Sequence, residues 1–175
     1  MKRFLLVVCL LLWAAACSSQ PVYDDDEVAA IVMDEKITVG EIRFIYDVND
    51  QELPKMVKEF VKEEIMVQKA KEMGLDISEE AEETLAFTHL PPEDSEDPLR
   101  KFVEKQAKKV GMSEEKYYQD YLKKTTKRSQ YVNQYILKEL GHPHSDNEND
   151  YVDNVNKHVN NLITKYADEI EILIK

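Results

Sequence analysis

The last residues of the chain constrain its fold more than any other segment. From residue 169 to residue 174 polar and apolar side chains begin to alternate, which is the period-two pattern of a β-strand. A strand by itself leaves backbone N–H and C=O groups unpaired, so it needs a partner. The other β-prone material lies at residues 28–33 and 36–38, on either side of a turn at Asp34 and Glu35. We therefore expect the two ends of the folded part to meet in one small sheet.

Between these ends, apolar residues recur at helical spacing. The stripes occupy residues 53–73, 98–110, 114–140 and 152–166. Gly74, Gly111 and Gly141 follow the first three stripes, and glycine commonly ends helices. A Pro-rich stretch at 89–96 predicts a surface loop, and a polar stretch at 142–150 predicts a linker. The sequence predicts a mainly α fold, a single helical domain over residues 28–175 that includes the small sheet.

Helix starts carry recognisable caps. Thr38 and Glu41 have the spacing of a capping box, in which the hydroxyl accepts from the Glu41 N–H and the carboxylate accepts from the Thr38 N–H. Ser78, Asp97 and Ser113 are N-cap candidates for later helices. We expect a short helix directly after Thr38.

One carboxylate interrupts an apolar stripe. At 100° per residue Glu64 falls within the stripe formed by Val57, Phe60 and Val61. A buried carboxylate needs hydrogen-bond donors, so we expect Glu64 to bond to backbone N–H groups or to a tyrosine and to fix how helices and sheet meet. A catalytic role would require a second acid or base, which the sequence does not identify.

Aromatic residues concentrate on the helix at 114–140. They are Tyr117, Tyr118, Tyr121, Tyr131 and Tyr135. A tyrosine combines an apolar ring with a polar tip, which suits the binding of extended peptides of varied sequence. The alternative is that these rings fill the core between helices.

The N-terminus has the three parts of a secretory signal: Lys2 and Arg3, an apolar run over 4–13, and small residues before Cys17. The apolar run is shorter than the roughly 20 residues that span a bilayer. The ending resembles the lipobox of bacterial lipoproteins, with Cys17 as the lipidated residue, although Ala14 stands where Leu is usual. We expect residues 1–16 to be removed and 17–27 to form an acidic flexible tether. Plain secretion after cleavage is the alternative.

Charge and cysteine content narrow the partners. The formal net charge is −12, and loss of Lys2 and Arg3 with the signal would make it −14. An acidic surface repels phosphate backbones, so nucleic acid is not expected as a partner. After removal of Cys9 only Cys17 would remain, so no intramolecular disulfide is expected.

No sequence feature indicates an enzyme or a cofactor site. The chain lacks a Gly-rich phosphate loop, G-x-S-x-G and H-E-x-x-H. Residues 142–148 include histidines and acids, but without the ligand spacing of a zinc finger or an EF-hand loop. We expect no catalytic residue, no metal and no cofactor.

The order of these elements resembles the N-terminal chaperone domain of the SurA and PrsA group of extracytoplasmic folding factors. The resemblance rests on the strand-turn-strand, the capping box, residues 58–70, residues 73–80, and residues 111–115 with the helix that follows. It covers about residues 28–140, and the last helix and strand fit the segment that completes this domain.

The resemblance implies a chaperone-like protein that binds unfolded or partly folded secreted polypeptides. Members that isomerise prolyl bonds carry a parvulin domain of about 90 residues between the long helix and the final one. Here that place holds only residues 141–150, so no isomerase activity is expected. An adaptor lipoprotein that binds one folded partner, or its own copy, is the alternative. We expect an extracytoplasmic location, on the outer face of the cell membrane or at the outer membrane where a second membrane exists.

Overall fold

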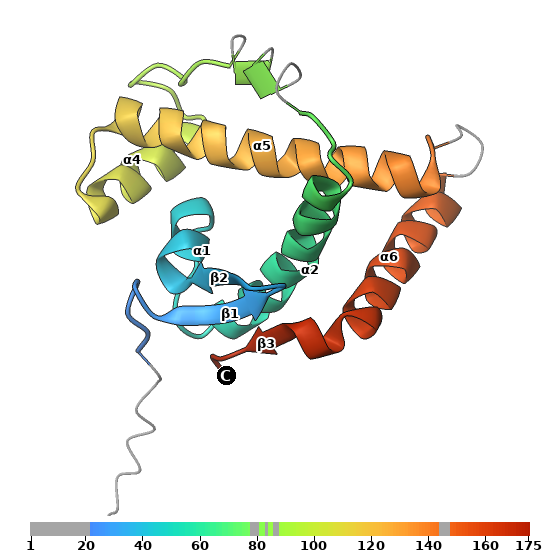
Figure 1. Ribbon diagram of the computed structural model, residues 1–175. Coiled ribbons are helices and arrows are strands. Elements are labelled where there is room, and N and C mark those ends of the chain that lie inside the picture. Colours follow the sequence, from blue (N-terminus) through green and yellow to red (C-terminus); the bar gives the residue numbers. More distant parts are fainter. Residues whose placement is uncertain (1–21, 78–80, 83, 86–87, 144–147) are drawn as a thin grey trace, which may run out of the picture.

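The computed structural model describes residues 22–77, 81–82, 84–85, 88–143 and 148–175, and it is mainly helical with a small three-stranded sheet (Figure 1). The strands are β1 (Val28–Val32), β2 (Glu35–Thr38) and β3 (Ile170–Ile172). The helices are α1 (Val39–Ile45), α2 (Leu53–Glu72), α4 (Pro98–Val110), α5 (Glu114–Leu140) and α6 (Glu148–Lys165), with a 3₁₀ turn at Ala167–Glu169. The predicted fold class is confirmed.

The two ends of the folded part pair in the sheet. β1 lies between β2 and β3, and both pairings are antiparallel. Ala30 pairs with Ile172, and the Leu173 N–H donates to the Ala29 carbonyl at 2.9 Å. The β1–β2 turn lies at Met33 and Asp34, one residue earlier than expected, and both have positive φ. The terminal sheet that the alternation predicts is confirmed.

The segment before β1 packs on the domain. The Tyr23 hydroxyl donates to the Lys175 carbonyl at 2.5 Å, and the Gly40 N–H donates to the Asp25 carbonyl at 2.8 Å. Arg43 donates to the Tyr23 carbonyl and pairs with Asp25. Residues 23–27, which the sequence assigns to the tether, thus contact α1 and the C-terminal residue through these bonds. The earlier part of the predicted tether, with Cys17, lies outside the described residues.

The helices begin and end where local chemistry indicates. The capping box is present, with the Glu41 N–H donating to the Thr38 hydroxyl at 3.2 Å and the Thr38 N–H to the Glu41 carboxylate at 2.9 Å. Asp97 and Ser113 accept from backbone N–H groups as N-caps. Gly111 is left-handed with φ 68°. The Ser78 cap lies outside the described residues.

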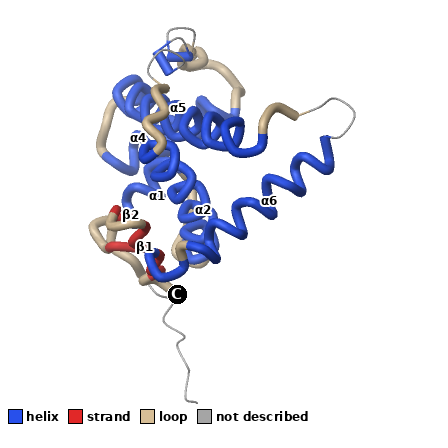
Figure 2. The backbone as a smooth tube through the Cα atoms, turned by 45° about the vertical axis from the view of Figure 1, so that its right-hand side comes forward, coloured by secondary structure: helices blue, strands red, loops and turns tan. Residues whose placement is uncertain are grey.

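The layout places α2 centrally, with α5 crossing one end of it (Figure 1). From the end of α5 the chain returns along α6 toward the sheet, as both views show (Figures 1 and 2). α6 begins at Glu148, so the expected linker over 142–150 is shorter than predicted. Among the described residues no helix is long and apolar enough to cross a membrane.

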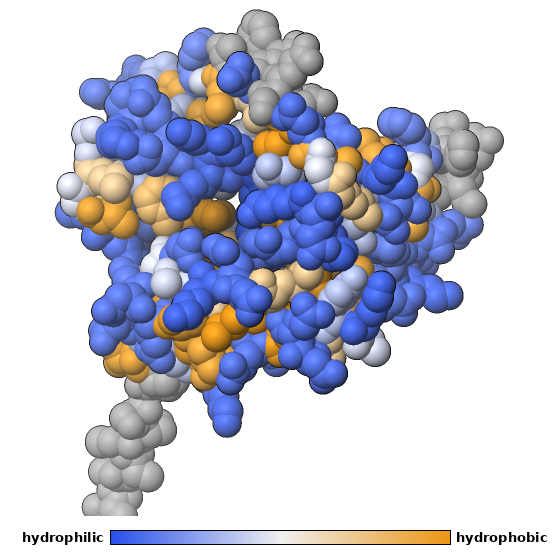
Figure 3. All heavy atoms as spheres, viewed as in Figure 1, coloured by the Kyte–Doolittle hydropathy of each residue, from blue (hydrophilic) through white to orange (hydrophobic). Residues whose placement is uncertain are grey.

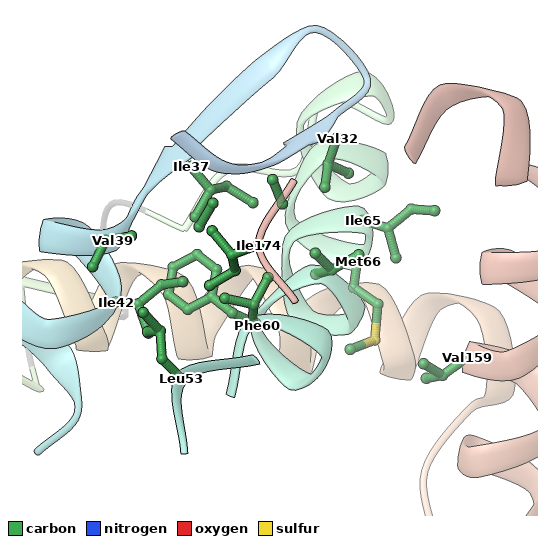
Figure 4. Close-up of a cluster of buried hydrophobic side chains, with 14 of the residues drawn as sticks. Val32, Ile37, Val39, Ile42, Leu53, Phe60, Ile65, Met66, Val159 and Ile174 are labelled. Atoms are coloured by element: carbon green, nitrogen blue, oxygen red, sulfur yellow. The ribbon is translucent and has the colours of Figure 1, made fainter. Parts of the chain in front are cut away.

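The core has two parts. The larger part joins the sheet, α1, α2 and α6, and Ile174 lies within it among Ile37, Ile42 and Phe60 (Figure 4). The smaller part joins α4 to the start of α5 around Tyr117. Burial of the last apolar residue thus completes a core built mainly from the first half of the chain. The surface is mostly hydrophilic on the face shown in Figure 3, with apolar side chains in separate patches.

Candidate functional site

Arg128 joins α5 to α2. Its guanidinium bonds to the Glu64 carboxylate, to Glu63 at 2.8 Å and to the Phe60 carbonyl at 2.9 Å. The guanidinium carbon also lies 3.8 Å from the centroid of the Phe60 ring, which is a cation–π geometry. All of these contacts reach across from one helix to the other, so Arg128 fixes where α5 crosses α2.

Glu64 is buried, as its place in the apolar stripe predicts, with 6% of the residue exposed. Its partners differ from the expectation. Instead of backbone N–H groups or a tyrosine, Arg128 and Gln68 donate to its two oxygens. A carboxylate that is removed from water is stabilised more by a positive charge than by a neutral donor. For Glu64 this positive charge is Arg128 of α5.

A hollow of about 300 Å³ opens beside this ion pair, between β2, α1, α2 and α5. We call it the α2–α5 groove. It is lined by Glu35, Lys36, Ile37, Glu41, Ile45, Phe60, Glu64, Val67, Lys71, Lys124, Lys127, Arg128 and Tyr131. Of its apolar and aromatic lining residues, Ile45 and Tyr131 are half-buried, whereas Ile37, Phe60 and Val67 are buried, and residues of β2 form one side.

A second hollow of about 310 Å³ lies against the other side of Arg128. Its lining includes Tyr46, Glu63, Tyr121 and Val132. Burial and then the neighbouring Glu63 charge raise the pKa of Tyr46 to about 12, so this hydroxyl remains protonated at neutral pH. Arg128 and Ile45 border both hollows, so the ion pair separates two sites where side chains of a ligand could sit.

The groove has the opposite charge to the chain as a whole. Five of its lining side chains are basic and three are acidic, in a chain of net charge −12. Lys71, Lys124 and Lys127 are exposed, and within the described part of the chain none of them pairs with a carboxylate. Two lie over aromatic rings instead, Lys71 at 6.0 Å and Lys124 at 5.6 Å from the ring centroid. Their positive charge is therefore free to attract an anionic group.

Three of the five candidate tyrosines are core residues. Tyr117, Tyr118 and Tyr135 are at most 2% exposed. The Tyr117 hydroxyl donates to the Phe44 carbonyl at 2.6 Å, and Tyr135 shares a hydrogen bond of 2.9 Å with His158. The peptide-binding interpretation is corrected for these three, because a side chain without exposed surface cannot contact a polypeptide.

The remaining two tyrosines border the hollows. Tyr131 lines the α2–α5 groove and Tyr121 lines the second hollow, and both are half-buried. They lie on opposite sides of Arg128 along α5. Of the five aromatic rings, these two have the exposed surface that a peptide-binding role requires.

Sequence reasoning missed Arg128 although a signal was present. Tyr121, Thr125, Arg128, Val132 and Tyr135 recur at spacings of four and three, so Arg128 lies within the inward stripe of α5. A cation in one stripe and a carboxylate in another are natural partners. The chain separation of 64 residues hides that pairing.

The described residues contain no group of three or more His, Cys, Asp or Glu side chains placed to hold a metal ion. Residues 144–147 of the histidine-containing segment lie outside the described residues. Among the predicted site residues, the capping box borders the α2–α5 groove through Glu41, and Glu64 forms part of its floor.

No family model, no curated protein and no solved structure matches this chain.

Proposed function

We propose that this protein is a lipid-anchored extracytoplasmic chaperone-like protein that binds unfolded or partly folded secreted polypeptides and does not isomerise prolyl bonds. The observation that carries the proposal is the α2–α5 groove beside an edge strand. β2 is an outer strand of the sheet, and the groove that it lines also contains the half-buried Ile45 and Tyr131. Extended polypeptides bind to such places by adding a strand, which needs no particular client sequence.

The order of elements supports the kinship with the SurA and PrsA chaperone domains. The strand pair, the capping box, the long helices and the closing strand occur in the order that the resemblance implies. Between α5 and α6 the chain has only residues 141–147, too few for a catalytic domain of about 90 residues.

The lipid at Cys17 is part of the proposal. Val22, the first described residue, follows Cys17 by five positions, and five residues span at most about 18 Å. Because residues 23–27 are docked on the domain, an anchor at Cys17 would keep the sheet end of the molecule close to the membrane surface. Cys17→Ser should move the protein from the membrane fraction to the soluble one, whereas retention would argue against the lipid.

Aggregation of a reduced, unfolded secreted protein tests the holding activity. Purified protein at several-fold molar excess should slow light scattering of the client, and Tyr131→Ala should weaken this by removing a half-buried aromatic ring from the groove. Crosslinking in intact cells should return many partners. One dominant partner would favour the adaptor function instead, and an unchanged scattering rate would remove the chaperone proposal.

A further inference from the structure

The unusual charge of the α2–α5 groove carries an inference about what binds there. The groove lining carries five basic and three acidic side chains, a net positive charge, in a protein whose formal net charge is −12. Lys71 from α2 and Lys124 and Lys127 from α5 nevertheless converge on one hollow. Two helices remote in sequence supply them, so the cluster is a product of the fold.

The neighbouring carboxylates do not cancel this charge. Glu64 is bonded to Arg128, and Glu41 to the Thr38 N–H in the capping box. Glu35 and Lys36 are adjacent exposed residues of opposite charge on β2. Pairing Glu64 with Arg128 and Glu35 with Lys36 leaves the three lysines and the Glu41 carboxylate, a net charge of +2, and at physiological ionic strength charges beyond about 8 Å are largely screened. A ligand within the groove therefore meets a positive local field in spite of the acidic remainder of the protein.

The shape of the groove favours an extended chain. β2 is an outer strand, and within the described residues no other strand pairs with its outer edge. The Thr38 N–H already donates to the Glu41 carboxylate, so residues 35–37 are the part of this edge whose backbone groups a peptide could meet, while the flanking groove receives alternate side chains. The half-buried Ile45 and Tyr131 supply apolar surface in the groove, whereas Ile37 and Phe60 are buried beneath it, and the exposed lysines line the same hollow.

We propose that the α2–α5 groove binds extended polypeptide segments in which carboxylates alternate with apolar residues, and that these segments add to the edge of β2. The inference rests on the proposed function, because it names the chemical class of client that the groove selects. The lysines supply selectivity for acidic segments, and the edge strand with its apolar surroundings supplies contacts that any extended chain could use.

Fluorescence anisotropy with labelled ten-residue peptides tests the charge preference. An alternating Glu–Val peptide should bind the purified protein at least tenfold more tightly than the Gln–Val peptide, a difference of about 1.4 kcal/mol. The preference should shrink as salt rises from 50 to 300 mM, because free ions screen the lysines. Equal affinities of the two peptides would overturn the proposal.

A matched pair of variants locates the site. The triple variant Lys71→Gln, Lys124→Gln, Lys127→Gln should lose about tenfold in affinity for the Glu–Val peptide. The control Lys58→Gln, Lys138→Gln, Lys157→Gln changes net charge equally at exposed positions away from the groove and should change affinity less than twofold. Equal losses in both would mean that net charge, and no particular site, governs binding.

Backbone methylation tests the strand addition. Two Glu–Val peptides, N-methylated at alternate positions in opposite phase, differ only in which edge of the peptide has lost its N–H groups. One should bind like the unmodified peptide and the other at least tenfold more weakly. If both bind like the parent, β2 does not pair with the ligand and the inference fails.

Failure of this inference is distinguishable from failure of the proposed function. If wild type slows client aggregation but binds the Glu–Val and Gln–Val peptides equally, the chaperone function stands and the acidic selectivity falls. If wild type binds the Glu–Val peptide at the groove but does not slow aggregation, the selective site stands and the general holding activity falls.

Discussion

Replacing Arg128 with methionine tests whether one ion pair holds α5 against α2. Methionine keeps an apolar stem over Phe60 and removes the guanidinium. The Glu64 side chain is 8% exposed and that of Arg128 13%, so the variant leaves a buried carboxylate without its cation. Breaking a buried pair in this way costs about 3–5 kcal/mol. Because Gln68 still donates to Glu64, we expect Arg128→Met to lower the free energy of unfolding by about 3 kcal/mol, the lower end of that range.

The complementary substitution Glu64→Gln removes the buried charge and leaves Arg128 with Glu63, 38% exposed, and the Phe60 carbonyl. We expect a loss of about 1–2 kcal/mol. In the double variant neither charge is present, so its loss should fall below the sum of the single losses by at least about 1 kcal/mol. Urea unfolding followed by far-UV circular dichroism measures all three, because the protein is mainly helical.

The control is Lys62→Met, which breaks the exposed pair with Glu59 on the same helix. Its cost should stay below about 1 kcal/mol. If the effects of Arg128→Met and Glu64→Gln add to within about 0.5 kcal/mol, the pair does not act as a unit and our account of the helix crossing is refuted.

Three further predictions concern single side chains. In urea unfolding Ile174→Ala should cost about 3 kcal/mol, because Ile174 is 4% exposed, and Leu173→Ala, at a 44% exposed position, under about 1 kcal/mol. Tyr117→Phe should cost about 1 kcal/mol through its lost hydrogen bond, whereas Tyr118→Phe should be neutral or stabilising, since its buried hydroxyl has no partner among the described residues. Burial raises the pKa of Tyr46 to about 12, so the folded state keeps a proton that the unfolded chain loses near pH 10. The free energy of unfolding should therefore fall as the pH rises from about 10 to about 12. The fall should be less steep in Tyr46→Phe, which has no hydroxyl to ionise.

The parts of the fold that could be predicted depend on local chemistry. The alternation near Ile172 predicts a strand, and the only other β-prone residues are at the far end of the folded part, so the sheet follows by elimination. Helix ends follow from Gly111, and helix starts from Thr38 and Asp97, because caps and left-handed glycines act within a few residues.

The docked segment before β1 could not be predicted in this way. Three consecutive aspartates from Asp24 suggest a solvated tether. This prediction uses side-chain composition alone and cannot account for backbone hydrogen bonds. What holds the segment is mostly backbone: the carbonyls of Tyr23 and Asp25 accept from Arg43 and Gly40. A Cβ on residue 40 would lie 2.8 Å from the Asp25 carbonyl oxygen, so this close approach requires glycine there. Such contacts are visible only once α1 and the segment are placed together.

Buried polar side chains show what the sequence can and cannot reveal about the site. Glu64, Arg100 and Gln106 are the buried polar residues of the described chain, and each joins two elements. Arg100 of α4 pairs with Glu114 at the start of α5, and Gln106 donates to the Arg43 carbonyl of α1 at 3.3 Å. A polar residue within an apolar stripe therefore indicates a junction, because most buried polar groups are hydrogen-bonded to another part of the fold. Which element supplies the partner depends on tertiary structure.

Glu64 differs from the other two because its junction is also the floor of the α2–α5 groove. The ion pair that positions α5 also gives the groove its shape, so stability and binding are coupled there. Loss of peptide binding in Arg128→Met would therefore follow either from a lost contact or from a displaced helix. Lys71, Lys124 and Lys127 are exposed and carry no described ion pair, so their substitution changes the charge of the groove while its walls stay in place. Substitutions of the three lysines therefore test how the groove selects its ligand, and substitutions of Arg128 and Glu64 test what holds the fold together.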